Sequence, residues 1–515
     1  MKRLMSAASI RRWLVIGSTP LAASFGVSCS SSGDTGPTGG PGPGVGAASA
    51  AGGTSSTSGT GNGAPGTGGT VMLGDVTDQM PVGPCMGLEC QVPACSGNPK
   101  ATSISGKVYD PAGKVPLYNV MVYVPNGPVM PLPEGAGCDR CGATITNPVT
   151  SAITDEAGAF KLEGVPAGDS VPLVIQVGKW RRQITVPGVS PCVDTAVADP
   201  NLTRLPRNKA EGDIPRIAIS VGAADQMECL PLRMGLDASE FSTPDGDGRI
   251  HLYRGDSGRT GTQPLSEFDA AHGGARLPPS ADLWSTADSL MRYDITILSC
   301  EGGTNAQGKP MSSREALYKY ASQGGRVFAS HFHSVWFENG PDPLPSTGTW
   351  GERRPNPAGS AGDPNGDGTP IPGTINQSFP KGEALAKWLL NVGASTALGS
   401  METVYPRDNI QAVNAEVARE WITVDNPNFP DAPKAIQYMS FNTPIGVPEE
   451  QMCGREVYTN LHVAAVDVDT ISHTAGFPAS CEVRDLTAQE KAVAFMLFDL
   501  SSCVMSDEKV PKPPK

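Results

Sequence analysis

The sequence is short of charge, of aromatic side chains and of histidine. Of its 515 residues, 18% are charged, 6% are aromatic and six are His, and the net charge is −13. A protein that binds nucleic acid needs a basic face, so this balance excludes nucleic acid as a partner. The chain has no nucleotide-binding motif either. Glycine and proline are abundant instead, with 61 Gly and 48 Pro. The length suggests roughly three domains, but the Gly and Pro content indicates that part of the chain is linker.

The chain begins with the pattern of a secretory signal. Residues 1–28 carry four basic and no acidic side chains, and their apolar run at 13–23 is too short to span a bilayer. The Phe-Gly-Val-Ser stretch before Cys29 resembles the cleavage box of bacterial lipoproteins, which implies lipidation of Cys29 and a membrane as partner through that lipid. Ser30 implies, by the same resemblance, an exported outer-membrane lipoprotein that faces the periplasm or the cell surface. Cleavage after Ser24, which leaves Cys29 as a thiol, is the alternative.

A tether and a neck are expected to follow the signal. Gly, Ser, Thr and Pro dominate residues 29–80, which bury too little apolar surface to offset the entropy of ordering, so a disordered tether is predicted. A Cys-rich neck covers residues 81–100, where Cys85, Cys90 and Cys95 recur every five residues. That spacing favours disulfide staples over zinc. Residues 506–515 are expected to form a flexible tail.

The cysteines also report on pairing. The chain has twelve, and an exported chain meets an oxidising compartment in which cysteines pair. With the first one lipidated, eleven remain, so at least one stays unpaired within the chain. The Cys-Asp-Arg-Cys motif at 138–141 is predicted to form a disulfide, and Cys453 is predicted to pair with Cys481. Cys300 is the candidate odd thiol, with a bond to Cys229 as the alternative.

Residues 101–200 are predicted to form an antiparallel β-sandwich. Short runs alternate apolar and polar residues between turn signals, at 104–109, 120–124, 160–162, 171–177 and 182–186. The region resembles the carboxypeptidase regulatory-like domain, a transthyretin-type sandwich. The likeness rests on Ser-Gly-Lys-Val-Tyr-Asp at 105–110, Thr-Asp-Glu-Ala-Gly at 154–158 and Val-Pro-Ala-Gly at 165–168. It implies a non-catalytic module of a kind sometimes grouped with starch-binding sandwiches.

Trp180, Arg181 and Arg182 are the candidate ligand-binding residues of this region. An indole ring stacks on a sugar and guanidinium groups donate hydrogen bonds to its hydroxyls, so the three predict a site for carbohydrate or another envelope polymer. The alternative is that Trp180 packs inside the protein.

Residues 210–505 are predicted to form an α/β domain with a mostly parallel sheet, of the flavodoxin or amidotransferase type. Buried strands are expected at 217–221, 294–299, 326–330 and 456–461, and helices at 223–230, 312–323, 381–392 and 486–500, the last capped by Thr487. Ligands of such sheets bind at the carboxyl ends of the strands. At those ends the sequence places the candidate catalytic residues Cys300, Glu301, His331, His333 and His462.

These segments resemble the class I glutamine-amidotransferase-like superfamily, and within it the trehalose-utilisation type. The likeness rests on Tyr-Ala-Ser-Gln-Gly-Gly-Arg-Val-Phe at 320–328, which leads to His331, and on Gly-Arg-Glu-Val-Tyr-Thr-Asn-Leu-His at 454–462. It covers about 215–500, with insertions near 340–380 and 400–450. His331 stands where glutaminases of the superfamily carry the nucleophilic cysteine, so glutamine hydrolysis is not expected. The two domains together resemble bacterial lipoproteins of unassigned function.

Two kinds of chemistry fit the strand-end residues. In the first, Cys300 is a nucleophile that one of the three histidines activates, with Glu301 beside it. In the second, the histidines hold a divalent metal together with Glu301 or Asp294. A packed, hydrogen-bonded cluster without chemistry is the third interpretation.

A separate motif, with Asp363, Asn365 and Asp367 at alternate positions, opens like a calcium loop. Its twelfth position is Thr374 in place of Glu, and nearby prolines preclude the helix that would follow. The alternatives are a shorter calcium loop and a plain polar turn.

Together these predictions describe an envelope-anchored binding or interaction protein, for carbohydrate or an envelope polymer, whose amidotransferase-like domain lacks the usual nucleophile. The alternative is a hydrolase that acts on a sugar or an amide through the strand-end Cys and His residues or a metal. A purely structural envelope component is the third hypothesis.

Overall fold

The structure is a computed structural model that describes residues 85–139, 145, 147–257, 263–351, 369–425, 433–463 and 475–513. The chain divides into two units, residues 1–78 and 79–515, and all that follows concerns the second. The predicted signal at 1–28 and the tether at 29–80 lie outside the described residues.

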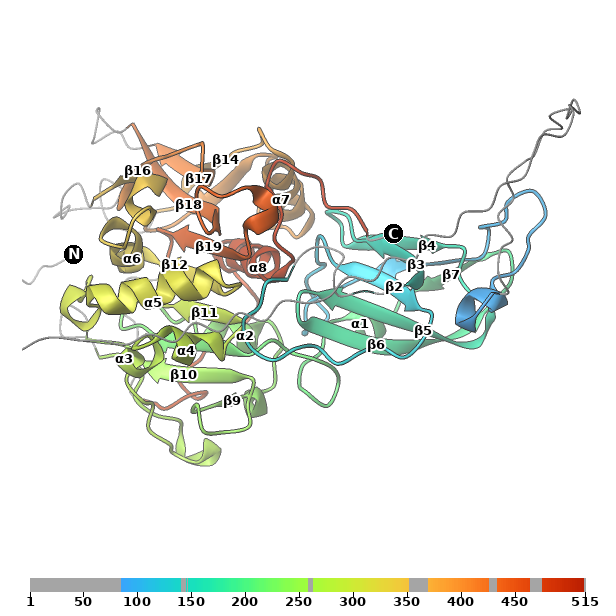
Figure 1. Ribbon diagram of the computed structural model, residues 1–515, viewed down its shortest axis with the longest axis horizontal. Coiled ribbons are helices and arrows are strands. Elements are labelled where there is room, and N and C mark those ends of the chain that lie inside the picture. The colour runs from blue at the N-terminus through green and yellow to red at the C-terminus, as the bar shows by residue number, and fades with distance from the viewer. Residues whose placement is uncertain are drawn as a thin grey trace, which may run out of the picture. The chain divides into compact units, whose positions relative to one another are not determined.

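Two small sheets occupy residues 103–197 (Figure 1). Their strands are β1 (Ser103–Lys107), β2 (Met121–Pro125), β3 (Pro148–Ile153), β4 (Ala159–Glu163), β5 (Gly168–Val177), β6 (Trp180–Val189) and β7 (Asp194–Val197), before the short helix α1 (Pro200–Thr203). One sheet has the order β4-β1-β7 and the other β3-β2-β5-β6. All neighbours are antiparallel except β1 and β7.

Alternate residues of these strands face a shared core. In β4, Phe160 and Leu162 are buried, whereas the residues between and after them are exposed. Ile104 of one sheet and Leu173 and Ile175 of the other belong to the same hydrophobic cluster. This period of two made most of the strands readable in the sequence. It missed β3, whose residues are all half-buried, and β7, which buries a single residue.

A ten-stranded sheet runs through residues 217–459. Its strands are β8 (Ile217–Val221), β9 (Phe241–Ser242), β10 (Ile250–Arg254), β11 (Ile295–Leu298), β12 (Arg326–Ser330), β14 (Ile371–Ile375), β15 (Ser400–Thr403), β17 (Ala418–Asp425), β18 (Lys434–Thr443) and β19 (Gly454–Thr459). Their order is β15-β14-β17-β18-β19-β12-β11-β8-β10-β9. A further antiparallel pair joins β13 (Gly348–Trp350) to β16 (Ile410–Val413).

Only one half of the large sheet is parallel. The strands from β19 to β9 run parallel to their neighbours, whereas β18, β17, β14 and β15 pair antiparallel. The prediction of a mostly parallel sheet is therefore wrong for residues 371–443. Antiparallel neighbours need no crossover helix, and the described residues of this stretch have one helix, at 380–391, so strand and helix do not alternate regularly there as the prediction required.

The helices of this part are α2 (Cys229–Arg233), α3 (Ser280–Leu283), α4 (Ala287–Met291), α5 (Met311–Ser322), α6 (Val335–Glu338), α7 (Pro380–Asn391) and α8 (Ala488–Ser501). The three long predicted helices are confirmed as α5, α7 and α8. Thr487 caps α8 as predicted, since its Oγ1 accepts from the Glu490 N–H and the Glu490 carboxylate accepts from the Thr487 N–H. The helix predicted at 223–230 is wrong, because α2 begins only at Cys229.

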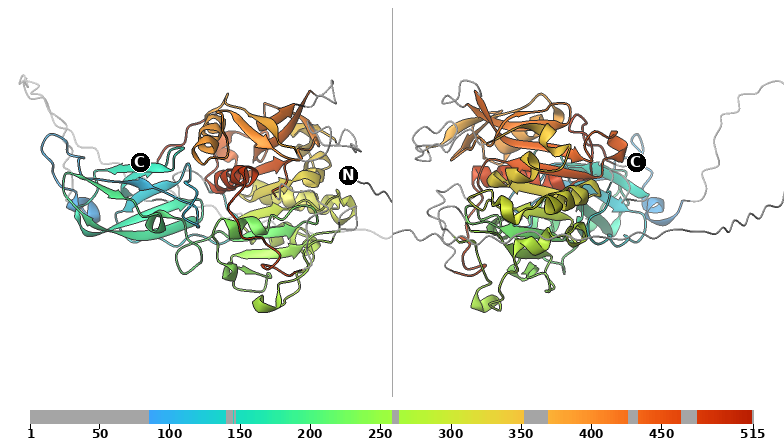
Figure 2. Two further views of the ribbon diagram at one scale, coloured as in Figure 1. Left: turned by 180° about the vertical axis from the view of Figure 1, so that it is seen from behind. Right: turned by 60° about the vertical axis from the view of Figure 1, so that its left-hand side comes forward.

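The large sheet is covered on both faces. Figure 1 shows α5 in front of it, and α8 comes forward in the view from behind in Figure 2. Successive residues of β19 point to opposite faces of the sheet. Arg455 forms a 3.1 Å ion pair with Asp499 of α8, so Glu456, the next residue, faces the other side. Both Arg455 and Glu456 are buried. Burial on both faces explains why β8, β11 and β12 read as continuous apolar runs.

The disulfides differ from most of the predicted ones. The bonds are Cys85–Cys90, Cys95–Cys192, Cys138–Cys453 and Cys229–Cys481, and Cys503 is disulfide-bonded as well. The predicted pairs Cys138–Cys141 and Cys453–Cys481 are wrong. Two of the actual bonds join residues 315 and 252 positions apart, a distance that local spacing cannot reveal. Cys300 is the free cysteine among the described residues, as the odd-thiol prediction expected.

Candidate functional site

Three of the predicted site residues meet at the carboxyl edge of the large sheet. Cys300 comes shortly after β11, His331 directly after β12 and His462 shortly after β19. These three strands are neighbours and run parallel, so their carboxyl ends lie at one edge. The exposed fractions of the three side chains are 0%, 4% and 3%.

The side-chain atoms of Cys300, His331 and His462 form a compact triangle. Sγ of Cys300 lies 3.4 Å from Nδ1 of His331, which lies 3.1 Å from Nε2 of His462. The three potential ligand atoms lie within 4.8 Å of one another. Nδ1 of His462, on the other side of its ring, has no hydrogen-bond partner among the described residues. The protein part that the structure describes thus leaves one buried ring nitrogen of the cluster unsatisfied.

The backbone holds His331 in an unusual conformation. Its φ angle is 44°, in the left-handed region that residues other than glycine rarely adopt. His331 opens the short 3₁₀ helix η5 (His331–Ser334), so it lies on a tight turn from strand to helix. The hydroxyl of Tyr458, on β19, donates a 2.8 Å hydrogen bond to its carbonyl oxygen. Such conformations persist where surrounding contacts fix them, and they cluster at functional sites.

All three groups of the triangle are held in their neutral forms. Burial, together with the negative charge of Asp225, raises the pKa of the Cys300 thiol to about 12. Burial lowers the pKa of His331 well below its usual range and lowers the pKa of His462 to about 3. At neutral pH the cluster is therefore a thiol with two neutral imidazoles. A nucleophilic cysteine needs its thiolate, so this electrostatic setting opposes the nucleophile hypothesis.

Glu301 and His333 lie near the triangle but do not join it. The carboxylate of Glu301 forms an ion pair of 2.6 Å with Lys309, and both side chains are 1% exposed. Nε2 of His333 donates to the carbonyl oxygen of Ser299 at 2.9 Å, and its Nδ1 accepts from Nε1 of Trp336 at 2.8 Å. Both ring nitrogens are therefore occupied. The structure therefore does not bring these two residues together with the triangle, and their predicted catalytic roles stay predictions.

The other predicted metal ligands do not reach the triangle. Asp294 immediately precedes β11, at the opposite edge of the sheet, and its carboxylate pairs with Lys179 at 2.5 Å. The predicted calcium ligands Asp363, Asn365 and Asp367 lie outside the described residues, as does the predicted lipidation residue Cys29.

The residues predicted to bind carbohydrate are engaged in packing and ion pairs. Trp180 is 4% exposed, and its ring packs edge-on against Phe498 with 6.0 Å between the ring centroids. Arg181 forms a 2.7 Å ion pair with Asp213, and Arg182 donates to backbone carbonyl groups. A buried indole has no free face for a sugar. The alternative, that Trp180 packs inside the protein, is therefore correct.

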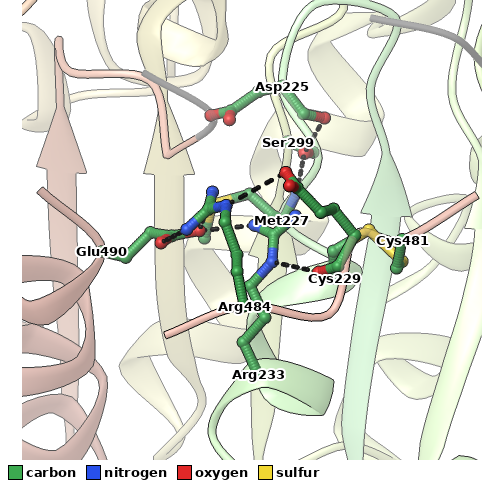
Figure 3. Close-up of a disulfide and its surroundings, with 9 residues drawn as sticks. Asp225, Met227, Cys229, Arg233, Ser299, Cys481, Arg484 and Glu490 are labelled. Atoms are coloured by element: carbon green, nitrogen blue, oxygen red, sulfur yellow. Dashed lines mark hydrogen bonds and ion pairs between the residues drawn. A yellow bond between two sulfur atoms is a disulfide. The ribbon is translucent and has the colours of Figure 1, made fainter. Parts of the chain in front are cut away.

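Asp225 holds the three segments of the triangle together and was not predicted from the sequence. Its carboxylate accepts hydrogen bonds from the Ser330 hydroxyl at 2.8 Å and from the Val463 N–H at 2.9 Å. Its carbonyl oxygen accepts one from the Ser299 hydroxyl at 2.9 Å, which Figure 3 shows. Each of these three partners is adjacent in sequence to one member of the triangle. Asp225 could have been predicted from its position just after β8, because the carboxyl end of that strand lies at the same edge of the sheet as the triangle.

The turn that carries Asp225 also touches Cys300 directly. The Ala224 N–H donates to the carbonyl oxygen of Cys300 at 3.0 Å. A Cβ atom at Gly222 would lie 2.0 Å from that same oxygen, so the turn approaches as closely as it does only because residue 222 is glycine.

A disulfide anchors the segment after this turn (Figure 3). Cys229, at the start of α2, is bonded to Cys481, which precedes α8 in the chain. Arg233 of α2 and Arg484 both form ion pairs with the buried carboxylate of Glu490 on α8. The segment after the turn is thereby tied to α8 by the Arg233 ion pair and to the residues before α8 by the disulfide, and the Arg484 ion pair holds those residues to the helix.

Comparisons with known proteins assign no family. No family model matches the chain, and no curated protein matches it. Among solved structures, a type II cohesin–X-dockerin complex from Acetivibrio cellulolyticus, an N-terminal interface mutant, is 16% identical over 26% of this chain and 85% of its own, with a TM-score of 0.15. A C-terminal interface mutant of that complex is 17% identical over 29% and 79%, with a TM-score of 0.13. At such TM-scores neither likeness supports a statement about fold or function.

No helix in the described part of the chain combines the length and the apolar character that crossing a membrane requires.

Proposed function

We propose that this protein is an exported envelope protein that binds a transition-metal ion through Cys300, His331 and His462. The observation that carries the proposal is the convergence of these three side chains, from three separate strand ends, into one buried triangle. A thiolate with two imidazoles is a donor set that suits zinc and other soft or borderline transition metals. Three protein ligands also leave a coordination position for water or a substrate, as in catalytic zinc sites.

The spacing of the triangle supports a shared ion. In a tetrahedral zinc site, two ligand nitrogens lie about 3.3 Å apart, and a nitrogen and a sulfur about 3.6 Å apart. The observed separations are 3.1 Å between His331 and His462 and 3.4 Å between Cys300 and His331. Small side-chain movements would therefore suffice for coordination.

The free thiol supports the same proposal. Every other cysteine in the described residues is disulfide-bonded, in keeping with an oxidising compartment. Burial protects the Cys300 thiol there, and a metal ion would protect it further. The second candidate function, a hydrolase with Cys300 as nucleophile, is favoured by the 3.4 Å contact with His331 but opposed by the raised pKa of the thiol.

The wider architecture remains part of the proposal. The small sheets would form a module of the carboxypeptidase regulatory-like type, and the large sheet a domain of the amidotransferase-like type with His331 at the position of the nucleophile. The turn after β12, with its φ of 44°, supports this placement of His331. Lipidation at Cys29, the outer membrane as location and an envelope polymer as partner stay proposals that rest on the sequence.

Metal analysis of the purified protein tests the function. The protein is isolated without chelator, and metal content is measured by mass spectrometry before and after reconstitution with Co²⁺. We expect about one equivalent of metal and a thiolate-to-cobalt charge-transfer band, because Cys300 would be a ligand. Cys300→Ser should remove the band, and His462→Ala should lower the metal content.

A matched control separates the site from histidines in general. His272 is exposed and pairs with Asp269, and it belongs to a different segment from the three residues of the triangle, so His272→Ala should leave metal content unchanged. The proposal fails if the wild-type protein binds no metal, or if Cys300→Ser and His462→Ala bind as much as His272→Ala. Alkylation of native Cys300 at a rate near that of a free thiol would instead favour the nucleophilic hydrolase.

A further inference from the structure

Asp225 is the common point of contact of the proposed metal ligands. Cys300, His331 and His462 lie on three separate segments, which must be held in register for a shared ion. Asp225 accepts a hydrogen bond from the residue next to each of them, and its side chain is fully buried. Partners outside the ligand shell orient metal ligands, and their loss typically lowers metal affinity about 10–100-fold.

The negative charge of Asp225 attracts a metal cation and repels a thiolate anion. Both carboxylate oxygens accept hydrogen bonds, from the segments that follow β12 and β19. A negative charge here opposes formation of a thiolate at Cys300 but attracts a metal ion. By Coulomb's law, its attraction for a divalent ion is twice that for a monovalent ion at the same place. Asp225 therefore acts on position and on ion charge together.

Building on the proposed function, we propose that Asp225 is the positioning residue of the metal site and that its charge makes the site prefer a divalent ion such as Zn²⁺ over Cu⁺. Both ions accept thiolate and imidazole ligands, so the donor set alone does not separate them. Either ion displaces the proton of the thiol, and that proton leaves to the solvent in both cases, so this step cancels in the comparison. The two ions therefore differ in their charge, and the attraction of Asp225 for a bound ion depends on that charge.

The test compares two ions in one variant. Asp225→Asn keeps the size of the side chain and removes its charge. Affinities for Co²⁺, as a spectroscopic probe of the divalent site, and for Cu⁺ are measured by competition with chelators under anaerobic conditions. We expect Co²⁺ affinity to fall about 10–100-fold. The fall for Cu⁺ should be smaller, because loss of positioning weakens both ions equally, whereas the lost Coulomb attraction is half as large for a monovalent ion.

Asp110→Asn is the matched control. Asp110 is also buried and accepts hydrogen bonds from the backbone N–H groups of Lys114 and Val115. It lies shortly after β1, in the region of the two small sheets. Its substitution should affect stability and leave both metal affinities unchanged. Circular dichroism and disulfide mapping establish that each variant is folded.

The outcomes separate this inference from the proposed function. Equal losses for Co²⁺ and Cu⁺ in Asp225→Asn, or no loss, overturn the charge preference while wild-type binding stands. A wild-type protein that binds neither ion overturns both proposals. If Asp225→Asn does not fold, Ser330→Ala, which removes one hydrogen bond and leaves the charge, should weaken both ions equally by about 3–10-fold. Unchanged affinities in that variant overturn the positioning role.

Discussion

Glu456 is an acid buried in an apolar row of the large sheet, and its replacement by Gln should change how stability depends on pH. Its neighbours across the strands are Val327 on β12 and Phe441 on β18, which share its face of the sheet. The side chain is 1% exposed, and one carboxyl oxygen has no partner among the described residues. Burial raises the pKa of Glu456 from 4.5 to about 8.

The sign and size of the effect follow from this shift. Between pH 4.5 and about 8 the native protein keeps the proton on Glu456, while the unfolded chain has lost it. Because the unfolded state binds fewer protons, stability falls as the pH rises, by about 1.4 kcal/mol per pH unit for one group. The contribution of Glu456 is thus fully present below pH 4.5 and is lost by about pH 8, with about 5 kcal/mol as its ceiling.

Urea unfolding at a series of pH values measures this slope. Glu456→Gln should follow wild type near pH 5 apart from a constant offset, and should lose less stability toward pH 8. Glu315→Gln, an exposed site on α5, makes the same charge change and should keep the wild-type slope. Tryptophan fluorescence with the disulfides intact provides the signal. Parallel pH curves for Glu456→Gln and wild type would refute the argument, since they would mean that Glu456 is ionised in the native protein.

Three further substitutions probe the site and its frame. Gly222→Ala places a Cβ atom 2.0 Å from the carbonyl oxygen of Cys300, so that segment must shift, and Co²⁺ affinity should fall by about 10-fold or more in the chelator competition; unchanged affinity would show that the turn can move away at no cost. Lys381→Met leaves the buried carboxylate of Asp499, now 2.7 Å from the Lys381 ammonium, without that partner, and should lower the free energy of unfolding by about 3–5 kcal/mol in urea titrations. A loss within 1 kcal/mol, roughly that of an exposed pair, would contradict the buried placement. Trp180→Ala removes a buried ring and should cost about 3–5 kcal/mol, measured by thermal unfolding; a merely surface-exposed Trp180 would give almost no change.

The elements that the sequence predicted best are those whose local pattern is strong. Thr487 and Glu490 three residues later form a capping box, and the structure has it. Strand β12 was found because five buried residues follow a Gly-Gly turn. By contrast, the four antiparallel strands between 371 and 443 were missed, although β17 pairs with β18 and β14 with β15, strands that are near in sequence.

The sequence by itself placed Cys300, His331 and His462 at the ends of three strands and marked an odd cysteine. It could do so because a strand is recognised from neighbouring residues, and an odd cysteine is recognised by counting the cysteines. Only the tertiary structure decided which side chains meet. In the structure, His333 and Glu301 bond to other partners, Trp180 is buried, and Asp225 contacts the segments of all three triangle residues. Hydrogen bonds and packing between distant segments depend on the register of the sheet, which no single stretch of sequence encodes.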